Sequence, residues 1–192
     1  MKGWTRGAGL AIMIAVLVLA GCNKKQGGES GANMASLGSG TGSAAGTRWA
    51  VPKRWVPQGE RPMRAATYAI PEEEGDPEKG ECAVFYFGSG QGGDVQSNIN
   101  RWIGQFETSG VPAQSQQEVS GMKLTLVQIA GAYLAPAGPM MQSTGKKENY
   151  RLLGAIVEAP EGLVFFKLVG PARTITAAEG EFHAMIASLA KL

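Results

Sequence analysis

Two apolar runs near the C-terminal end of the chain constrain its fold most strongly. The runs YRLLGAIVEA, residues 150–159, and LVFFKLVG, residues 163–170, are separated only by Pro160-Glu161-Gly162. Apolar runs of this length joined by a proline–glycine turn are typical of a β-hairpin. We therefore expect the folded part of the chain to be organised around an antiparallel sheet.

Further strands are expected upstream of this hairpin. Residues 63–71 alternate in polarity, residues 82–88 form a short apolar run, and residues 121–136 alternate over a greater length. These patterns predict strands, with a bend at Gly131 in the last of them.

Two helices are expected to pack on this sheet. Asp94 is a suitable N-cap for the first helix, and Gly110 and Pro112 are expected to end it. Its apolar stripe comprises Val95, Ile99, Trp102, Ile103 and Phe106. The second helix is expected within residues 171–192, with Thr176 as its cap. The order β-β-α-β-β-β-α predicts an α+β domain with a largely antiparallel sheet packed by two main helices.

The N-terminal residues predict export and lipid attachment. Two basic residues, Lys2 and Arg6, precede an apolar run at residues 8–20. As a helix this run rises only about 20 Å, short of the roughly 30 Å hydrocarbon core, which is typical of a signal peptide. Leu19-Ala20-Gly21-Cys22 resembles the lipobox of bacterial lipoproteins, in which the cysteine is acylated and becomes the N-terminus. The alternative is an ordinary secretory signal with an incidental cysteine.

This resemblance implies a place in the cell and a division of the chain. Residues 1–21 would be the lipoprotein signal peptide and Cys22 the anchor in the membrane of the cell envelope. Because Asn23 rather than aspartate follows the cysteine, we expect the outer membrane, facing the periplasm, in a Gram-negative cell. Residues 22–47 are rich in glycine and serine and are expected to be a flexible linker. Residues 48–192 are expected to form a single domain.

The charge of the expected domain argues against a nucleic-acid partner. Residues 48–192 contain 14 Lys and Arg against 15 Asp and Glu, so the basic excess of the whole chain comes from its N-terminal part. A nearly neutral exported domain offers no electrostatic footprint for nucleic acid. Cys82 would be the only cysteine left after acylation of Cys22, and we expect it to be a small buried strand residue rather than a reactive thiol.

The segment FGSGQGGDVQSNINRWIGQF, residues 87–106, contains a glycine pattern that is also found in dinucleotide-binding loops. Gly88, Gly90 and Gly93 match the spacing G-x-G-x-x-G. A true fingerprint lies in a βαβ unit, whereas the residues after this helix are polar and interrupted by proline. Asp94 also places a negative charge where a phosphate would bind. We therefore expect no dinucleotide and no other cofactor.

Two interpretations of the loop remain open. Backbone N–H groups around Gly90, Gly92 and Gly93 could bind a carboxylate or another small anion at the start of the helix. Alternatively, the glycines only permit the positive φ angles of a tight turn, which we favour.

A polar strip on the same helix is the second candidate binding feature. Asn98, Arg101 and Gln105 are spaced by three and four residues, so they share one helix face beside the loop. They could line a groove for an anionic or peptide ligand. They could equally be a solvated face on which Asn98 bonds to the loop backbone, and we favour this second interpretation.

Residues suited to catalysis or metal binding are few. His183 is the only histidine, lies off the apolar stripe of the last helix and is expected at the surface, so no multi-histidine metal site can form. The acidic residues 71–81 lack the alternating order of a calcium loop and are expected to be a solvated loop. No serine lies in a G-x-S-x-G turn.

Several segments together resemble a known group of proteins. The tryptophan-containing start of the domain, ATYAIP, the glycine-loop segment, YRLLGAIV, FFKLVGP and the final F-x-x-M-I-x-S-L pattern are similar to uncharacterised bacterial lipoproteins with a PsbP-like domain. The resemblance covers most of residues 48–192. It implies an antiparallel sheet with helices packed over it, and a binding or assembly accessory that is not an enzyme. It assigns no catalytic residue to this chain.

The leading hypothesis is therefore a lipid-anchored envelope protein that acts as a non-catalytic binding or assembly accessory, with a possible protein partner in the envelope. The alternative is a small envelope hydrolase with its site near Gly88–Arg101.

Overall fold

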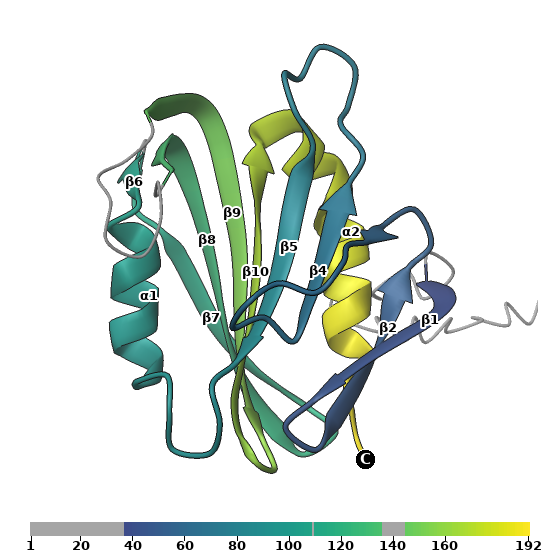
Figure 1. Ribbon diagram of the computed structural model, residues 1–192. Helices are drawn as coiled ribbons and strands as arrows, with labels where there is room; N and C mark the ends of the chain where they lie inside the picture. Colours follow the sequence, from purple (N-terminus) through teal and green to yellow (C-terminus); the bar gives the residue numbers. More distant parts are fainter. Residues whose placement is uncertain (1–36, 109, 136–144) are drawn as a thin grey trace, which may run out of the picture. The chain divides into compact units, whose positions relative to one another are not determined.

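The computed structural model describes residues 37–108, 110–135 and 145–192. Within these residues eight strands form one antiparallel sheet in the order β3-β4-β5-β10-β9-β8-β6, and β7 also pairs with β8 (Figure 1). In chain order they are β3 (Val56–Pro57), β4 (Ala66–Ile70), β5 (Gly80–Tyr86), β6 (Phe106–Thr108), β7 (Ala113–Val119), β8 (Met122–Leu134), β9 (Lys146–Ala159) and β10 (Gly162–Pro171). The expected hairpin of β9 and β10 lies at the centre of this sheet. With two helices packed on the sheet, the predicted α+β class is confirmed.

A second, three-stranded sheet begins inside the stretch that we expected to be linker. It has the order β1-β2-β11, with β1 at Leu37–Ala44, β2 at Thr47–Pro52 and β11 at Ala190–Lys191. The glycine- and serine-rich β1 has little side-chain surface to bury. Its backbone nevertheless pairs with β2, and Gly42 lies against the ring of Trp49. Backbone hydrogen bonds therefore order residues that composition alone assigns to a flexible chain.

The expected signal peptide, Cys22 and the first part of the expected linker lie within residues 1–36, outside the described residues. None of the helices in the described part of the chain is both long and apolar enough to cross a bilayer.

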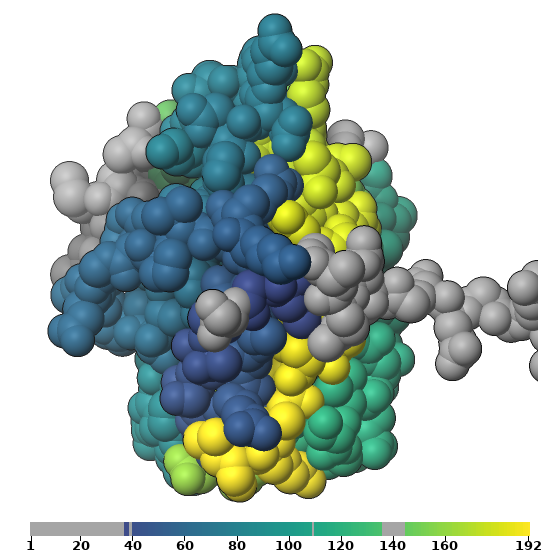
Figure 2. Space-filling view, turned by 90° about the vertical axis from the view of Figure 1, so that its right-hand side faces the viewer, coloured from purple at the N-terminus to yellow at the C-terminus, as the bar shows by residue number. Residues whose placement is uncertain are grey.

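The large sheet has a hydrophobic core on each face, because side chains alternate along its strands. On β10, Phe166 belongs to the core beneath α2 (Ala172–Ala187), whereas Phe165 belongs to the core beneath α1 (Val95–Ile103). The α2 core also receives Trp49 from β2, whose ring meets Phe166 edge-on at 5.0 Å between centroids. Figure 2 shows β1 and β2 beside the yellow surface of α2. The two helices thus cover opposite faces of one sheet.

Helix α1 begins as predicted but ends earlier. The Asp94 side chain accepts a hydrogen bond from the Ser97 N–H at 2.9 Å, which confirms the predicted N-cap. The helix ends at Ile103 with Gly104 as C-cap, so the prediction that Gly110 ends it was wrong. The reason is that the chain turns directly into β6, where Phe106 pairs with Tyr133 of β8.

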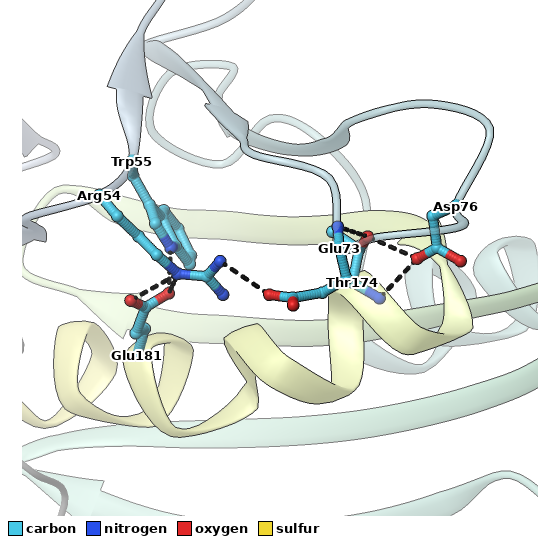
Figure 3. A network of polar contacts seen from close by, with 6 residues as sticks. All are labelled: Arg54, Trp55, Glu73, Asp76, Thr174 and Glu181. Carbon is cyan, nitrogen blue, oxygen red and sulfur yellow. Dashed lines mark hydrogen bonds and ion pairs between the residues drawn. The ribbon is translucent and has the colours of Figure 1, made fainter.

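The N-terminus of α2 is capped from another part of the chain. The predicted cap, Thr176, lies inside the helix and donates to the Ala172 carbonyl, so this prediction was wrong. Instead Asp76, in the acidic loop, accepts hydrogen bonds from the Thr174 N–H at 2.8 Å and the Thr174 hydroxyl at 2.6 Å (Figure 3). A carboxylate at this position satisfies free N–H groups and complements the helix dipole. Part of the loop at residues 71–81 therefore holds a helix end.

A second contact pins the middle of α2. The Glu181 carboxylate accepts hydrogen bonds from Arg54 Nε at 2.7 Å and from the indole N–H of Trp55 at 2.8 Å, and Arg54 also reaches Glu73 at 3.3 Å (Figure 3). Trp49 and Trp55 are both buried, so they anchor the start of the domain in the core.

Candidate functional site

A pocket of about 370 Å³ opens on the α1 side of the large sheet. Its floor is formed by neighbouring strands β5 and β10, and its walls come from α1, from Tyr133 of β8 and from the loop between β3 and β4. The residues that line it are Pro62, Met63, Arg64, Glu81, Ala83, Phe85, Phe87, Arg101, Trp102, Gln105, Tyr133, Phe165, Lys167 and Val169. This volume is within the range of small-molecule binding sites.

The register of β5 and β10 decides which side chains form the floor. Residues that pair directly across two antiparallel strands point to the same face of the sheet. Lys167 pairs with Ala83, with the pair Phe165 and Phe85 on one side. Because Ala83 is small, the lysine side chain has open space beside it at the floor of the pocket.

Lys167 is the central polar group of the pocket. Its Nζ donates a hydrogen bond to Gln105 Oε1 at 2.6 Å, contacts the Tyr133 hydroxyl at 3.5 Å and lies 5.5 Å from the centre of the Tyr133 ring. The pKa of Lys167 is lowered to about 8, first by burial and then by the positive charges of Arg101 and Arg64. The cation is thus held where water solvates it poorly.

The remaining charges leave the pocket with a positive excess. Glu81 is the one carboxylate in the lining, and it accepts from Arg61 at 3.0 Å and from Arg64 at 2.8 Å. Among the described residues, neither Lys167 nor Arg101 has a carboxylate within ion-pair distance. The Arg101 guanidinium donates instead to the Asn98 side-chain oxygen. Two cations of the pocket therefore lack a neutralising partner there.

Aromatic rings form much of the pocket wall. Phe85 and Phe87 are stacked at 5.9 Å between centroids, and Phe87 meets Phe165 at 5.8 Å. Trp102, 4% exposed, adds part of its indole from α1. Arg64 lies over the Phe85 ring at 5.5 Å, which couples the charged rim to the aromatic wall.

The structure separates the binding residues expected from the sequence. Of the polar strip, Arg101 and Gln105 line the pocket, but Gln105 lies in the turn after α1 and not on the helix as predicted. Asn98 is buried, and its Nδ2 donates to the Gly92 carbonyl and the Asp94 carbonyl, each at 2.8 Å. It therefore ties the loop to the helix and also orients Arg101 through its oxygen.

The glycines of the loop, Gly90, Gly92 and Gly93, do not line this pocket. All three adopt positive φ, as a tight turn requires. Gly92 is needed for packing as well, since a Cβ there would lie 2.7 Å from a carbon of the Phe87 ring. In this structure the loop connects the sheet to the helix. Because the loop does not line the pocket, the cations of the pocket do not support the small-anion interpretation.

The other chemically distinctive residues lie elsewhere. Cys82 is fully buried in the α2 core, and burial raises its pKa, so it is a structural residue as predicted. His183 is half-buried on α2, on the opposite face of the sheet from α1. No group of three or more His, Cys, Asp or Glu side chains in the described ranges could hold a metal ion.

The site also contains Lys167, Arg64 and Tyr133, which were not predicted from the sequence. A signal for Lys167 was present, because it is the single charged residue within the apolar strand LVFFKLVG. A charge at such a position is rarely buried without a partner or a function. Arg64 and Tyr133 carry no comparable signal, because only the fold brings them to Lys167.

Comparison with known proteins gives a likeness in structure but none in sequence. No family model matches the sequence, and no curated protein matches it. Among solved structures, the chain is similar to the solution structure of cyanobacterial PsbP (CyanoP) from Synechocystis sp. PCC 6803. The sequences are 12% identical, the alignment covers 80% of this chain and 92% of that chain, and the TM-score is 0.49. What the pocket binds is argued below from its own residues.

Proposed function

We propose that this chain is a lipid-anchored protein of the bacterial cell envelope that binds a small ligand in the pocket beneath α1 and acts as a non-catalytic binding or assembly accessory. The observation that carries the binding role is the pocket itself, in which two cations that have no carboxylate partner among the described residues face aromatic walls. The sequence Leu19-Ala20-Gly21-Cys22 supports the anchor, and Asn23 supports the outer membrane, facing the periplasm, where the cell has two membranes.

The hydrolase alternative has less support from the arrangement of side chains. Its site was expected near Gly88–Arg101, yet the only histidine, His183, lies on the helix that covers the opposite face of the sheet. Asp94, the carboxylate nearest the loop glycines, is engaged with Ser97 as the helix cap.

In-cell photo-crosslinking tests the binding role. A photo-crosslinking amino acid replaces Met63, which is 71% exposed at the rim of the pocket, and intact-mass spectrometry follows the purified protein. We expect a discrete small-molecule adduct that is reduced at least fivefold when Arg101→Met is added. The same substitution at Val111, 96% exposed and outside this pocket, is the control. The same adduct from both positions, or none from position 63, would contradict ligand binding here.

Metabolic labelling with palmitate tests the anchor. We expect the wild-type chain to be labelled and to fractionate with membranes, and Cys22→Ser to lose the label completely. Cys82→Ser is the matched control, because it removes the only other cysteine, which is buried within the domain. If the Cys22→Ser chain is still labelled, the lipid is attached elsewhere. If it is unlabelled but stays in the membrane fraction, an uncleaved signal rather than lipid holds the protein.

A further inference from the structure

The most unusual group in the described part of the molecule is the Lys167 ammonium. An ammonium group has three donors, and Lys167 uses one in a short hydrogen bond to Gln105 and a weaker contact with Tyr133. Both acceptors are neutral, since burial raises the pKa of Tyr133 and keeps its hydroxyl protonated. The lysine is thus poorly solvated and has no counter-charge within the described residues.

Resting on the binding function proposed above, we propose that the ligand is a small monoanion with a planar aromatic body. Its carboxylate, or a comparable anionic group, binds between Lys167 and Arg101, and its ring system packs against Phe85, Phe87 and Trp102. The chemistry of the pocket selects this class in two independent ways, by charge and by shape.

The charge argument follows from the charged side chains that line the pocket. Glu81 is already bound by two arginines, so it does not repel an incoming anion strongly. An anion beside Lys167 and Arg101 would give the poorly solvated Lys167 the counter-charge that it lacks among the described residues. Charge-assisted hydrogen bonds of this kind are shorter and stronger than neutral ones. A cationic ligand would instead meet three positive side chains: Arg64, Arg101 and Lys167.

The shape argument follows from the aromatic walls. Offset ring packing at centroid separations of about 4.5–7 Å is favourable beyond the area that it buries. Phe85 and Phe87 are already stacked in this manner, at 5.9 Å with 15° between their planes, and both line the pocket. A planar ring extends this stack, whereas a branched aliphatic body of the same volume cannot.

This ligand class also implies a pH dependence with a definite sign. The groups that face Lys167 are Arg64 from the loop, Glu81 from β5, Arg101 from α1 and Tyr133 from β8. Because the pKa of free Lys167 is about 8, the ammonium is fully charged near pH 6.5 and loses its proton above pH 8. Anion affinity should therefore be highest below pH 7 and fall as the pH rises through 8.

Calorimetric titration of the full chain held in lipid nanodiscs tests the inference, with empty nanodiscs as reference. The probes are 2-naphthoate and 2-naphthamide, which share one ring system and differ in charge. We expect naphthoate to bind at least tenfold more tightly than naphthamide at pH 6.5. Naphthoate affinity should fall at least fivefold between pH 6.5 and pH 9.5.

Three variants assign the effect to residues. Lys167→Met and Arg101→Met should each weaken naphthoate binding about tenfold and leave naphthamide binding within twofold, and Lys167→Met should also abolish the pH dependence. Lys123→Met, an exposed lysine outside the pocket, should change neither. Circular dichroism shows that each variant is folded.

The outcomes separate this inference from the proposed function. Equal binding of both probes with no effect of Lys167→Met would overturn the anion preference and leave a neutral-ligand pocket as the binding site. Binding of neither probe at millimolar concentration would contradict both the aromatic anion and the pocket as a small-molecule site.

Discussion

A Gly131→Ala variant is expected to lose about 3 kcal/mol of its free energy of unfolding, which combines overpacking with an unfavourable backbone conformation. Gly131 has a φ of +151°, and a Cβ at this position would lie 2.1 Å from the Glu107 carbonyl oxygen. Because that neighbour is backbone, strand β6 must move away from β8 to relieve the contact. The strand follows Gln105 directly, so the displacement should also disturb the pocket. Urea unfolding followed by circular dichroism measures the loss.

Gly180→Ala is the matched control for this prediction. Gly180 is exposed within α2 and nothing lies within 4 Å of a Cβ built there. Alanine is the better helix former, so this variant should be more stable by about 0.5–1 kcal/mol. If Gly131→Ala unfolds at the same urea concentration as the wild type, β6 is not held against β8 as described.

Replacing Trp102 with alanine is expected to lower the free energy of unfolding by about 3–5 kcal/mol, the usual cost of removing a large buried aromatic side chain. Trp102 is 4% exposed and fastens α1 to the sheet. Its ring lies directly over Gly154 of β9, where a Cβ would be 2.4 Å from the indole Cζ3. Because Gly154 has no side chain, the Trp102 ring packs directly against the backbone of β9.

A double-mutant cycle checks this pairing. Gly154→Ala alone should cost about 1–3 kcal/mol through overpacking, but in the Trp102→Ala background the ring that it meets is gone and the cost should largely disappear. The expected coupling is at least 1 kcal/mol between residues that are in contact. Additive losses in the cycle would show that α1 does not dock on β9 through these two residues.

Elements with strong local signals were the most predictable part of the fold. The hairpin of β9 and β10 and the Asp94 cap follow from hydrophobic period and turn or cap chemistry, and they appear where these predict. The predictions failed where contacts with residues far away in the sequence determine the local structure. Strand β1 is ordered by pairing with β2, and α2 is capped by Asp76 from another loop. Neither partner can be identified from neighbouring residues.

The candidate site was predictable only in part, for the same reason. Helical spacing is a local property, so the sequence could bring Arg101 and Gln105 together, although Gln105 lies just beyond the end of α1. The bond from Asn98 to the loop backbone was the favoured interpretation of the same strip. The sequence does not reveal that Gln105 bonds to Lys167, which is more than sixty residues away along the chain.

Local patterns in the sequence were enough to predict the α+β class, the central antiparallel hairpin, the cap of α1 and the structural role of Cys82. Each of these depends on residue period or on side-chain chemistry within a few positions. That two cations meet aromatic rings in one pocket follows only from the way the chain folds. The composition of this pocket depends on the register of β5 against β10, on Gly154 receiving Trp102 and on β6 following the helix immediately. These are packing contacts between residues that lie far apart in the sequence, so local sequence patterns do not predict them.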